Sequence, residues 1–149
     1  MSEENANVVR DFYEVLNERL AAYWSDPEQP LKELPGLQEV FDRLDPEVEW
    51  AWPLSPETFR GRERVLQAVS DWLDTVSDWR VEIKELIEGS RDRVLLIGHV
   101  VARGKGSGTP VNQPIFTAVT VRNGKVARIE DHTERAKAVE AAGLRSSEE

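Results

Sequence analysis

The spacing of apolar residues changes along the chain from a helical repeat to a strand-like one. Over residues 6–24, apolar side chains recur every three or four positions, which predicts an amphipathic helix capped by Asn5. The same spacing predicts a short helix over 37–44 and a longer one over 62–76. Residues 25–36 hold three prolines, so this segment is expected to be a loop.

Beyond residue 76 the apolar period falls to about two, which is typical of strands. Asn123-Gly124 is a two-residue hairpin signal between the last two of these strands. A final helix is expected over 134–142, ended by Gly143. The predicted strands cover residues 48–52, 79–88, 93–103, 112–122 and 125–132.

Helices followed by a run of long strands predict an α+β fold in which the helices cover one face of an antiparallel sheet. We expect one domain over residues 1–149, with 1–5 and 145–149 as frayed tails. A sheet covered on one side must expose or pair its other face, so we expect a homodimer through the outer sheet face.

Composition excludes several classes of function. The net charge of −9 opposes binding to nucleic acid or to anionic membranes, and the longest apolar runs are too short to span a bilayer. The chain has no cysteine, which excludes disulfides, thiolate metal sites and a cysteine nucleophile. The first residues are acidic and carry no apolar signal segment, so we expect a cytoplasmic protein.

Several segments, in order, resemble the SnoaL-like branch of the nuclear transport factor 2-like superfamily. Five parts of the chain are similar to that family's pattern: the opening helix over 7–17, the strand over 44–50, Phe59-Arg60-Gly61-Arg62-Glu63, the hairpin over 103–114, and the end over 122–126 and 136–144. The resemblance implies a cone-shaped fold with a curved sheet and a central pocket lined by the N-terminal helices. The superfamily includes isomerases, cyclases, epoxide hydrolases, dehydratases and proteins that only bind ligands, so the fold alone does not decide the function.

The residues that two of these enzyme classes use are mostly replaced in this chain. Relative to ketosteroid isomerases, the tyrosine position falls on Phe12, the base on Trp50 and the oxyanion acid on Phe116 or Thr117. Relative to limonene-type epoxide hydrolases, an arginine and an aspartate fall on His99 and Val101, and only the last carboxylate, Asp131, is kept. Neither mechanism is therefore expected.

SnoaL-type cyclases need an acid/base carboxylate and a polar partner, and Asp131 and His99 could fill these roles. Strand alternation places His99, Val101 and Arg103 on one face, and we expect that face to be shared with Asp131. In a dry cavity such a pair could transfer protons near neutral pH. The alternative is that Asp131 pairs with Arg103 or caps a turn, and that His99 is a hydrogen-bonded core residue.

The five tryptophans are compatible with a core or with an aromatic pocket wall. We expect Trp24 to form part of a lid with the proline-rich loop. A metal site is not expected, because the two histidines are 33 positions apart and on opposite sheet faces. A phosphate-binding loop is not expected at the glycines of 104–108, because a strand follows them and not a helix. The expected pocket residues are Tyr13, Trp50, Trp52, Trp72, Val101, Arg103, Gln113, Ile115 and Thr117.

The sequence thus predicts a domain that binds a small apolar or cyclic ligand without a cofactor. The alternative is a cofactor-free isomerase, cyclase or hydrolase that uses Asp131 and His99 on a polyketide-like or other carbonyl substrate. The two differ in whether both groups face the cavity within hydrogen-bonding reach of a ligand.

Overall fold

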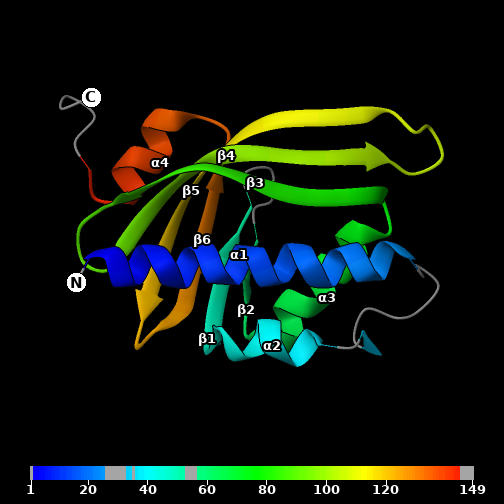
Figure 1. Cartoon of the computed structure of the whole chain (residues 1–149). Helices are drawn as coiled ribbons and strands as arrows, with labels where there is room; N and C mark the ends of the chain where they lie inside the picture. Colours follow the sequence, from blue (N-terminus) through cyan, green and yellow to red (C-terminus); the bar gives the residue numbers. More distant parts are fainter. Residues whose placement is uncertain (1, 26–32, 35, 53–56, 145–149) are drawn as a thin grey trace.

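Three helices lie against one face of a six-stranded sheet, and a fourth helix packs on the opposite face (Figure 1). The computed structural model describes residues 2–25, 33–34, 36–52 and 57–144. The helices are α1 (Ser2–Ser25), α2 (Leu37–Asp42), α3 (Arg62–Leu73) and α4 (Arg135–Ala141). The strands are β1 (Leu44–Ala51), β2 (Thr58–Arg60), β3 (Val76–Glu88), β4 (Arg93–Gly104), β5 (Pro110–Arg122) and β6 (Lys125–His132).

The strands lie in the order β2-β1-β6-β5-β4-β3, so β2 and β3 form the two edges. Only the β1–β6 pair of this sheet is parallel, and the other neighbours are antiparallel. Asn123 and Gly124 join β5 to β6 with φ values of 54° and 76°. Two consecutive positive φ values are what a type I′ hairpin turn requires, which agrees with the sequence prediction.

The face covered by α1, α2 and α3, which we call the inner face, carries most of the core. The apolar stripe of α1 is buried against it, and α3 adds a shorter stripe. From the sheet, the even-numbered residues of β4 and the odd-numbered residues of β5 point to this side, Val94, Leu96, Val119 and Val121 among them.

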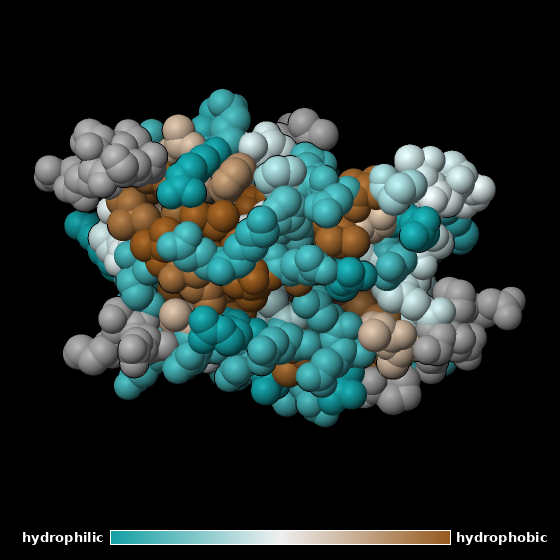
Figure 2. All heavy atoms as spheres, turned by 45° about the horizontal axis from the view of Figure 1, so that its top comes forward, coloured by the Kyte–Doolittle hydropathy of each residue, from teal (hydrophilic) through white to brown (hydrophobic). Residues whose placement is uncertain are grey.

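The other face, which we call the outer face, carries a smaller core under α4. Leu95 and Ala118 of the sheet pack against Ala138, Val139 and Ala142. Half-buried apolar side chains surround them, and Figure 2 shows apolar atoms gathered on this part of the surface. This border consists of Ile87, Ile97, Phe116, Ala141 and Leu144. The sheet is therefore covered in part on both faces, not on one face only as the sequence predicted.

The boundaries of α1 and α3 differ from the sequence expectations, and β2 is an additional strand. Helix α1 begins at Ser2, so Asn5 lies inside the helix and its amide donates to Asp92 Oδ1 at 3.2 Å instead of capping. The short edge strand β2 was not predicted, because three residues show too little alternation. Helix α3 ends at Leu73, and Val76 already belongs to β3. Within the proline-rich segment and the two tails, residues 1, 26–32, 35 and 145–149 lie outside the described residues.

Candidate functional site

Asp131, near the end of β6, holds the central ionisable group of the inner face. Its register partner on β5 is Thr117, and the Thr117 hydroxyl donates a hydrogen bond of 2.8 Å to Asp131 Oδ1. The Trp50 indole Nε1–H, from β1 on the other side, donates to Asp131 Oδ2 at 2.6 Å. Both carboxyl oxygens thus accept a hydrogen bond, an arrangement that suits an ionised carboxylate.

Burial raises the pKa of the Asp131 carboxyl above its usual range. The hydrogen bonds from Trp50 and Thr117 and the nearby His132 imidazole act in the opposite direction and lower this pKa, but burial is the largest effect. Within the described part of the chain, Asp131 makes no ion pair. The structure therefore holds a partly buried carboxylate with two neutral hydrogen-bond donors and, among the described residues, no ion-pair partner.

Tyr13 of α1 faces the same carboxylate from the helical layer. The residue is 2% exposed, and its pKa is raised well above the ordinary range, first by burial and then by the charge of Asp131. Tyr13 therefore stays a neutral phenol over the physiological pH range and can donate a hydrogen bond. Its neighbour Phe12, at a ring-centroid distance of 5.0 Å, points instead toward the space between the helices.

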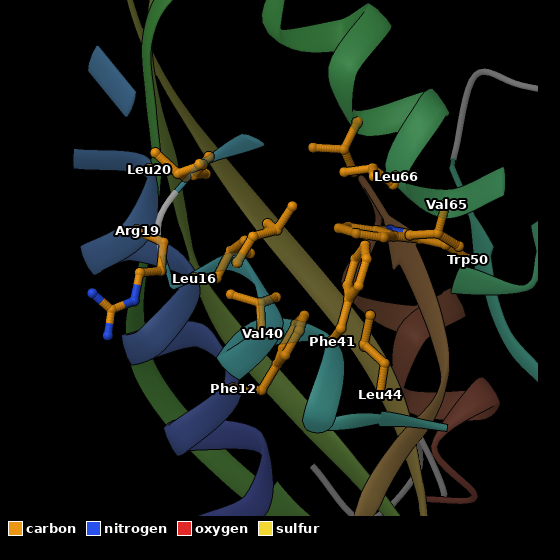
Figure 3. Close-up of a pocket in the computed structure, with 13 residues that line it drawn as sticks. Phe12, Leu16, Arg19, Leu20, Val40, Phe41, Leu44, Trp50, Val65 and Leu66 are labelled. Carbon is orange, nitrogen blue, oxygen red and sulfur yellow. The ribbon is translucent and has the colours of Figure 1, made fainter. Parts of the chain in front are cut away.

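That space is a small apolar cavity between α1, α2, α3 and β1 (Figure 3). Its volume is about 30 Å³, room for one or two water molecules, and no polar atom contributes surface to it. The residues around it are Phe12, Leu16, Arg19, Leu20, Leu34, Leu37, Val40, Phe41, Leu44, Trp50, Val65, Leu66 and Val69. A drug-sized ligand needs several hundred cubic ångströms, so a bound molecule would have to push some of these side chains aside.

Trp50 connects the cavity with Asp131. Its ring forms part of the cavity wall, and its Nε1 edge is bonded to the carboxylate. An aromatic cluster supports the ring from behind: Trp52 packs edge-on against Trp50 at 6.1 Å and against Phe59 at 4.8 Å. The cavity and the acidic group are therefore neighbours that share one side chain as a wall.

The prediction that His99 faces Asp131 is wrong. On β4 the even-numbered residues point to the inner core, so His99, Val101 and Arg103 point to the outer face. There His99 Nδ1 lies 2.7 Å from Asn112 Oδ1, and Arg103 donates to the Gly108 carbonyl at 3.1 Å. The alternative pairing of Asp131 with Arg103 is wrong for the same reason. Glu130 and His132 also point outward, so the expectation that the two histidines lie on opposite sheet faces is wrong, and Glu130 pairs there with Arg128.

Some of the other expected pocket residues lie near Asp131 or the inner core, and the rest are exposed to solvent. Thr117 touches Asp131, and Tyr13 and Trp50 lie beside it as described above. Ile115 is half-buried at the inner core and Trp52 stands behind Trp50. Gln113 is exposed farther out on β5, and Trp72 is 40% exposed on α3. Of the nine expected pocket residues, all within the described part of the chain, only Trp50 lines the cavity.

Sequence reasoning missed the contribution of α2 to the cavity. Leu37, Val40 and Phe41 form one wall of it, and Leu44 follows at the start of β1. The apolar spacing of residues 37–44 was the available signal, but it indicated only that a helix has a buried side. Which elements that side would meet depends on the tertiary packing.

The described residues contain no cluster of three or more histidine, cysteine, aspartate or glutamate side chains suited to a metal ion. In the same part of the chain, no helix is long and apolar enough to cross a membrane.

The comparisons with known proteins identify the family. The SnoaL-like domain matches residues 9–129. The chain belongs to the SnoaL-like family. No curated protein is significantly similar to this SnoaL-like chain in sequence.

Solved structures of low sequence identity share the fold over nearly the whole length. TerC, co-crystallised with polyporic acid, superposes with a TM-score of 0.69 at 20% identity, covering 92% of this chain and 96% of TerC. A nuclear transport factor 2-like protein of unknown function from Burkholderia pseudomallei K96243 gives 0.67 at 22% identity, covering 92% and 95%. A protein with a ketosteroid isomerase-like fold from Catenulispora acidiphila DSM 44928, in complex with trimethylamine, gives 0.59 at 16% identity, covering 90% and 95%.

Proposed function

We propose that this SnoaL-like domain binds a small, largely apolar or cyclic molecule between its helical layer and the inner face of the sheet. One observation carries the proposal. Trp50 places an ionisable carboxylate, Asp131, directly beside an apolar cavity. The cavity offers a place for the apolar body of a ligand, and Asp131, on the other side of Trp50, would offer it one polar contact once the site opens. A few well-placed polar groups in an apolar space are what small-molecule sites have in common.

The small size of the cavity fits a site that opens when a ligand enters. Leu37, Val40 and Phe41 belong to α2, a helix of six residues, and they form one wall. A short helix is held mostly by its packing, so its displacement is the least costly way to enlarge the space. TerC with polyporic acid and the Catenulispora protein with trimethylamine support small organic molecules as ligands of this fold.

A thermal-shift and titration screen tests the proposal. The panel would hold steroids, lactones, polyketide fragments, fatty acids and polyporic acid. A ligand at a hundred times its dissociation constant stabilises the folded state by about 2.7 kcal/mol, a rise in melting temperature of roughly 5–10 °C for a domain of this size. A true ligand must also move the Trp50 indole signal in NMR spectra, which a Trp50→Phe variant identifies. If no member of a broad panel moves that signal, the proposal is rejected.

The same geometry supports a second function, cofactor-free proton transfer on a carbonyl compound. Here Asp131 would act as base and the neutral Tyr13 phenol would donate a hydrogen bond to the carbonyl oxygen, in place of the predicted partner His99. The raised pKa values of both groups favour this role, because a base works best near the operating pH and a donor must stay protonated.

Solvent exchange tests the catalytic candidate. Incubation of a bound ketone in D₂O with the wild type would produce deuterium uptake next to the carbonyl, and Asp131→Asn would abolish it. Tyr13→Phe would slow uptake by about 10²–10³-fold, the range measured for loss of one oxyanion donor. If ligands bind and no exchange occurs above the Asp131→Asn background, the chain binds and does not catalyse.

We further propose a cytoplasmic homodimer formed through the outer face. Ile97, Phe116 and Leu144 leave an apolar area beside α4 that a second copy would cover (Figure 2). The cytoplasmic location is supported by the absence of cysteine from the sequence.

A further inference from the structure

We propose that the site selects ligands whose polar end is cationic, such as a small aliphatic or benzylic amine, and rejects carboxylates of the same size. The inference rests on the proposed binding function and specifies the charge of its ligand. It follows from the uncompensated carboxylate of Asp131 and from the aromatic wall that separates this carboxylate from the cavity.

Asp131 has no ion-pair partner among the described residues. Its two hydrogen bonds come from neutral donors, the Trp50 indole and the Thr117 hydroxyl. The third group that faces it, Tyr13, is a neutral phenol, and no ion pair with Asp131 occurs among the described residues. Asp131 is partly buried, and a carboxylate removed in part from water without an ion-pair partner is unfavourable. A cationic ligand therefore gains an attraction that no ion pair of the described residues supplies. An anionic ligand would add a second negative charge.

The wall of the cavity beside Asp131 is aromatic. Trp50, Phe12 and Phe41 present aromatic rings to the same space (Figure 3). The face of an aromatic ring attracts a cation, most strongly for indole, and this attraction is larger where water is excluded. Because the Trp50 N–H is already donated to Asp131, a cation on the ring lies near both the negative face of the indole and the carboxylate behind it.

Arg19 is the one charged residue among those that line the cavity, and its positive charge does not lie in the space where a cation would bind. Its guanidinium points away from the other lining side chains in Figure 3 and pairs with Glu39 at 2.8 Å. Its alkyl chain is what borders the space. The net charge of −9 acts in the same direction as the local charges, since it favours the approach of cations over anions.

A matched set of three probes tests the selection: benzylamine, benzyl alcohol and benzoate, which share a ring and differ in charge. Dissociation constants would be measured at pH 7 and 0.15 M salt by NMR titration, following the Trp50 indole signal. We expect benzylamine to bind at least about tenfold more tightly than benzoate, a difference of about 1.4 kcal/mol, with benzyl alcohol between them.

Two variants locate the cause of the preference. In Asp131→Asn the ratio of benzyl alcohol to benzylamine dissociation constants should fall toward one, and only the smaller preference due to the aromatic rings should remain. Asp71→Asn removes the same charge from the exposed side of α3, where Asp71 accepts a hydrogen bond from Gln67, and should leave the ratio as in the wild type. If Asp131→Asn does not fold, the order of the three dissociation constants on the wild type still shows whether the site prefers a cation.

Each outcome has one meaning. Benzoate binding as tightly as benzylamine would overturn the selection and leave the binding function standing. An amine preference that is undiminished in Asp131→Asn would show that Asp131 does not cause it and would also overturn the proposal. Failure of all three probes to bind, while a member of the screening panel still binds, would overturn the selection alone. Failure of the panel as well would reject the binding function.

Discussion

The side-chain amide of Asn17 makes two hydrogen bonds with the backbone of Val81. Asn17 Nδ2 donates to the Val81 carbonyl at 2.8 Å, and the Val81 N–H donates to Asn17 Oδ1 at 3.1 Å. Val81 lies on β3, an edge strand of the sheet. Helix α1 thus satisfies, through one side chain, a donor and an acceptor that a further strand would otherwise pair.

Replacing Asn17 by Leu should lower the free energy of unfolding by about 1–3 kcal/mol, because a half-buried N–H and carbonyl lose their partners. Urea denaturation followed by circular dichroism measures this loss. Asn7→Leu is the matched control, since Asn7 lies on the exposed side of the same helix and bonds only Arg10, and should change stability by less than about 0.5 kcal/mol. Equal effects of the two replacements would show that the bonds to Val81 contribute nothing measurable.

Trp50→Phe keeps an aromatic ring in the cavity wall and removes the donor to Asp131 Oδ2. We expect a loss of about 1.5–3 kcal/mol in unfolding free energy at neutral pH, the range for hydrogen bonds to a charged group. The pKa of Asp131 should rise further, because one of the two hydrogen bonds that favour its ionised form is gone. A carbon-13 titration of the carboxyl signal measures that shift. Trp72→Phe, at a 40% exposed position, should change neither quantity.

Asp131 should give the protein a pH-dependent stability of a specific sign. Burial raises its pKa in the folded state above the unfolded value of about 3.8, so the folded state binds the proton more tightly. The resulting stabilisation is fully present below the unfolded pKa and is lost as the pH rises through the raised folded pKa. Asp131→Asn should remove this part of the profile, because its amide can still accept from Trp50 and donate to Thr117.

Denaturation curves of the wild type and Asp131→Asn at several pH values measure the difference between the two profiles. A constant difference across the acidic range would mean that Asp131 does not titrate differently in the folded and unfolded states. Asp42→Asn, at an exposed site on α2, provides the control for loss of one carboxylate.

A charge on the outer face should prevent the proposed dimer. Ile97→Lys places an ammonium group in the apolar border beside α4, where a partner surface would have to desolvate it. Light scattering coupled to size exclusion should then report a monomer in place of the wild-type dimer. Val111→Lys, at a 39% exposed position on the far part of β5, is the control and should leave the dimer intact. A monomeric wild type would itself reject the dimer.

The sequence predicted the order of the main helices and strands because each of those segments carries its own local signal. The β5–β6 turn is a case in point, since Asn123 and Gly124 both adopt the positive φ values that their dipeptide favours. The hydrogen bond of Trp50 to Asp131 could not be predicted, because it depends on the pairing of β1 with β6, two strands that are distant in sequence.

The error at His99 has a definite physical origin. Val94, Leu95 and Leu96 are all buried, because helices cover both faces of β4 near its beginning. Alternation along such a strand shows which residues share a face, but not which of the two faces holds the cavity. Placing His99 correctly required knowing that α4 packs on the side opposite α1.

Phe12 and Tyr13 are consecutive residues of α1, and they project about 100° apart around the helix axis. Phe12 fills one side of the cavity, and Tyr13 faces the carboxylate of Asp131. Both side chains move with the same helix. A rotation of α1 about its axis that withdraws the Phe12 ring therefore turns the Tyr13 phenol through the same angle. Asn17 lies little more than one helical turn after Tyr13, and its two hydrogen bonds to Val81 limit how far α1 can rotate. A ligand that enters the cavity by displacing Phe12 would thus also change the position of the Tyr13 phenol relative to Asp131.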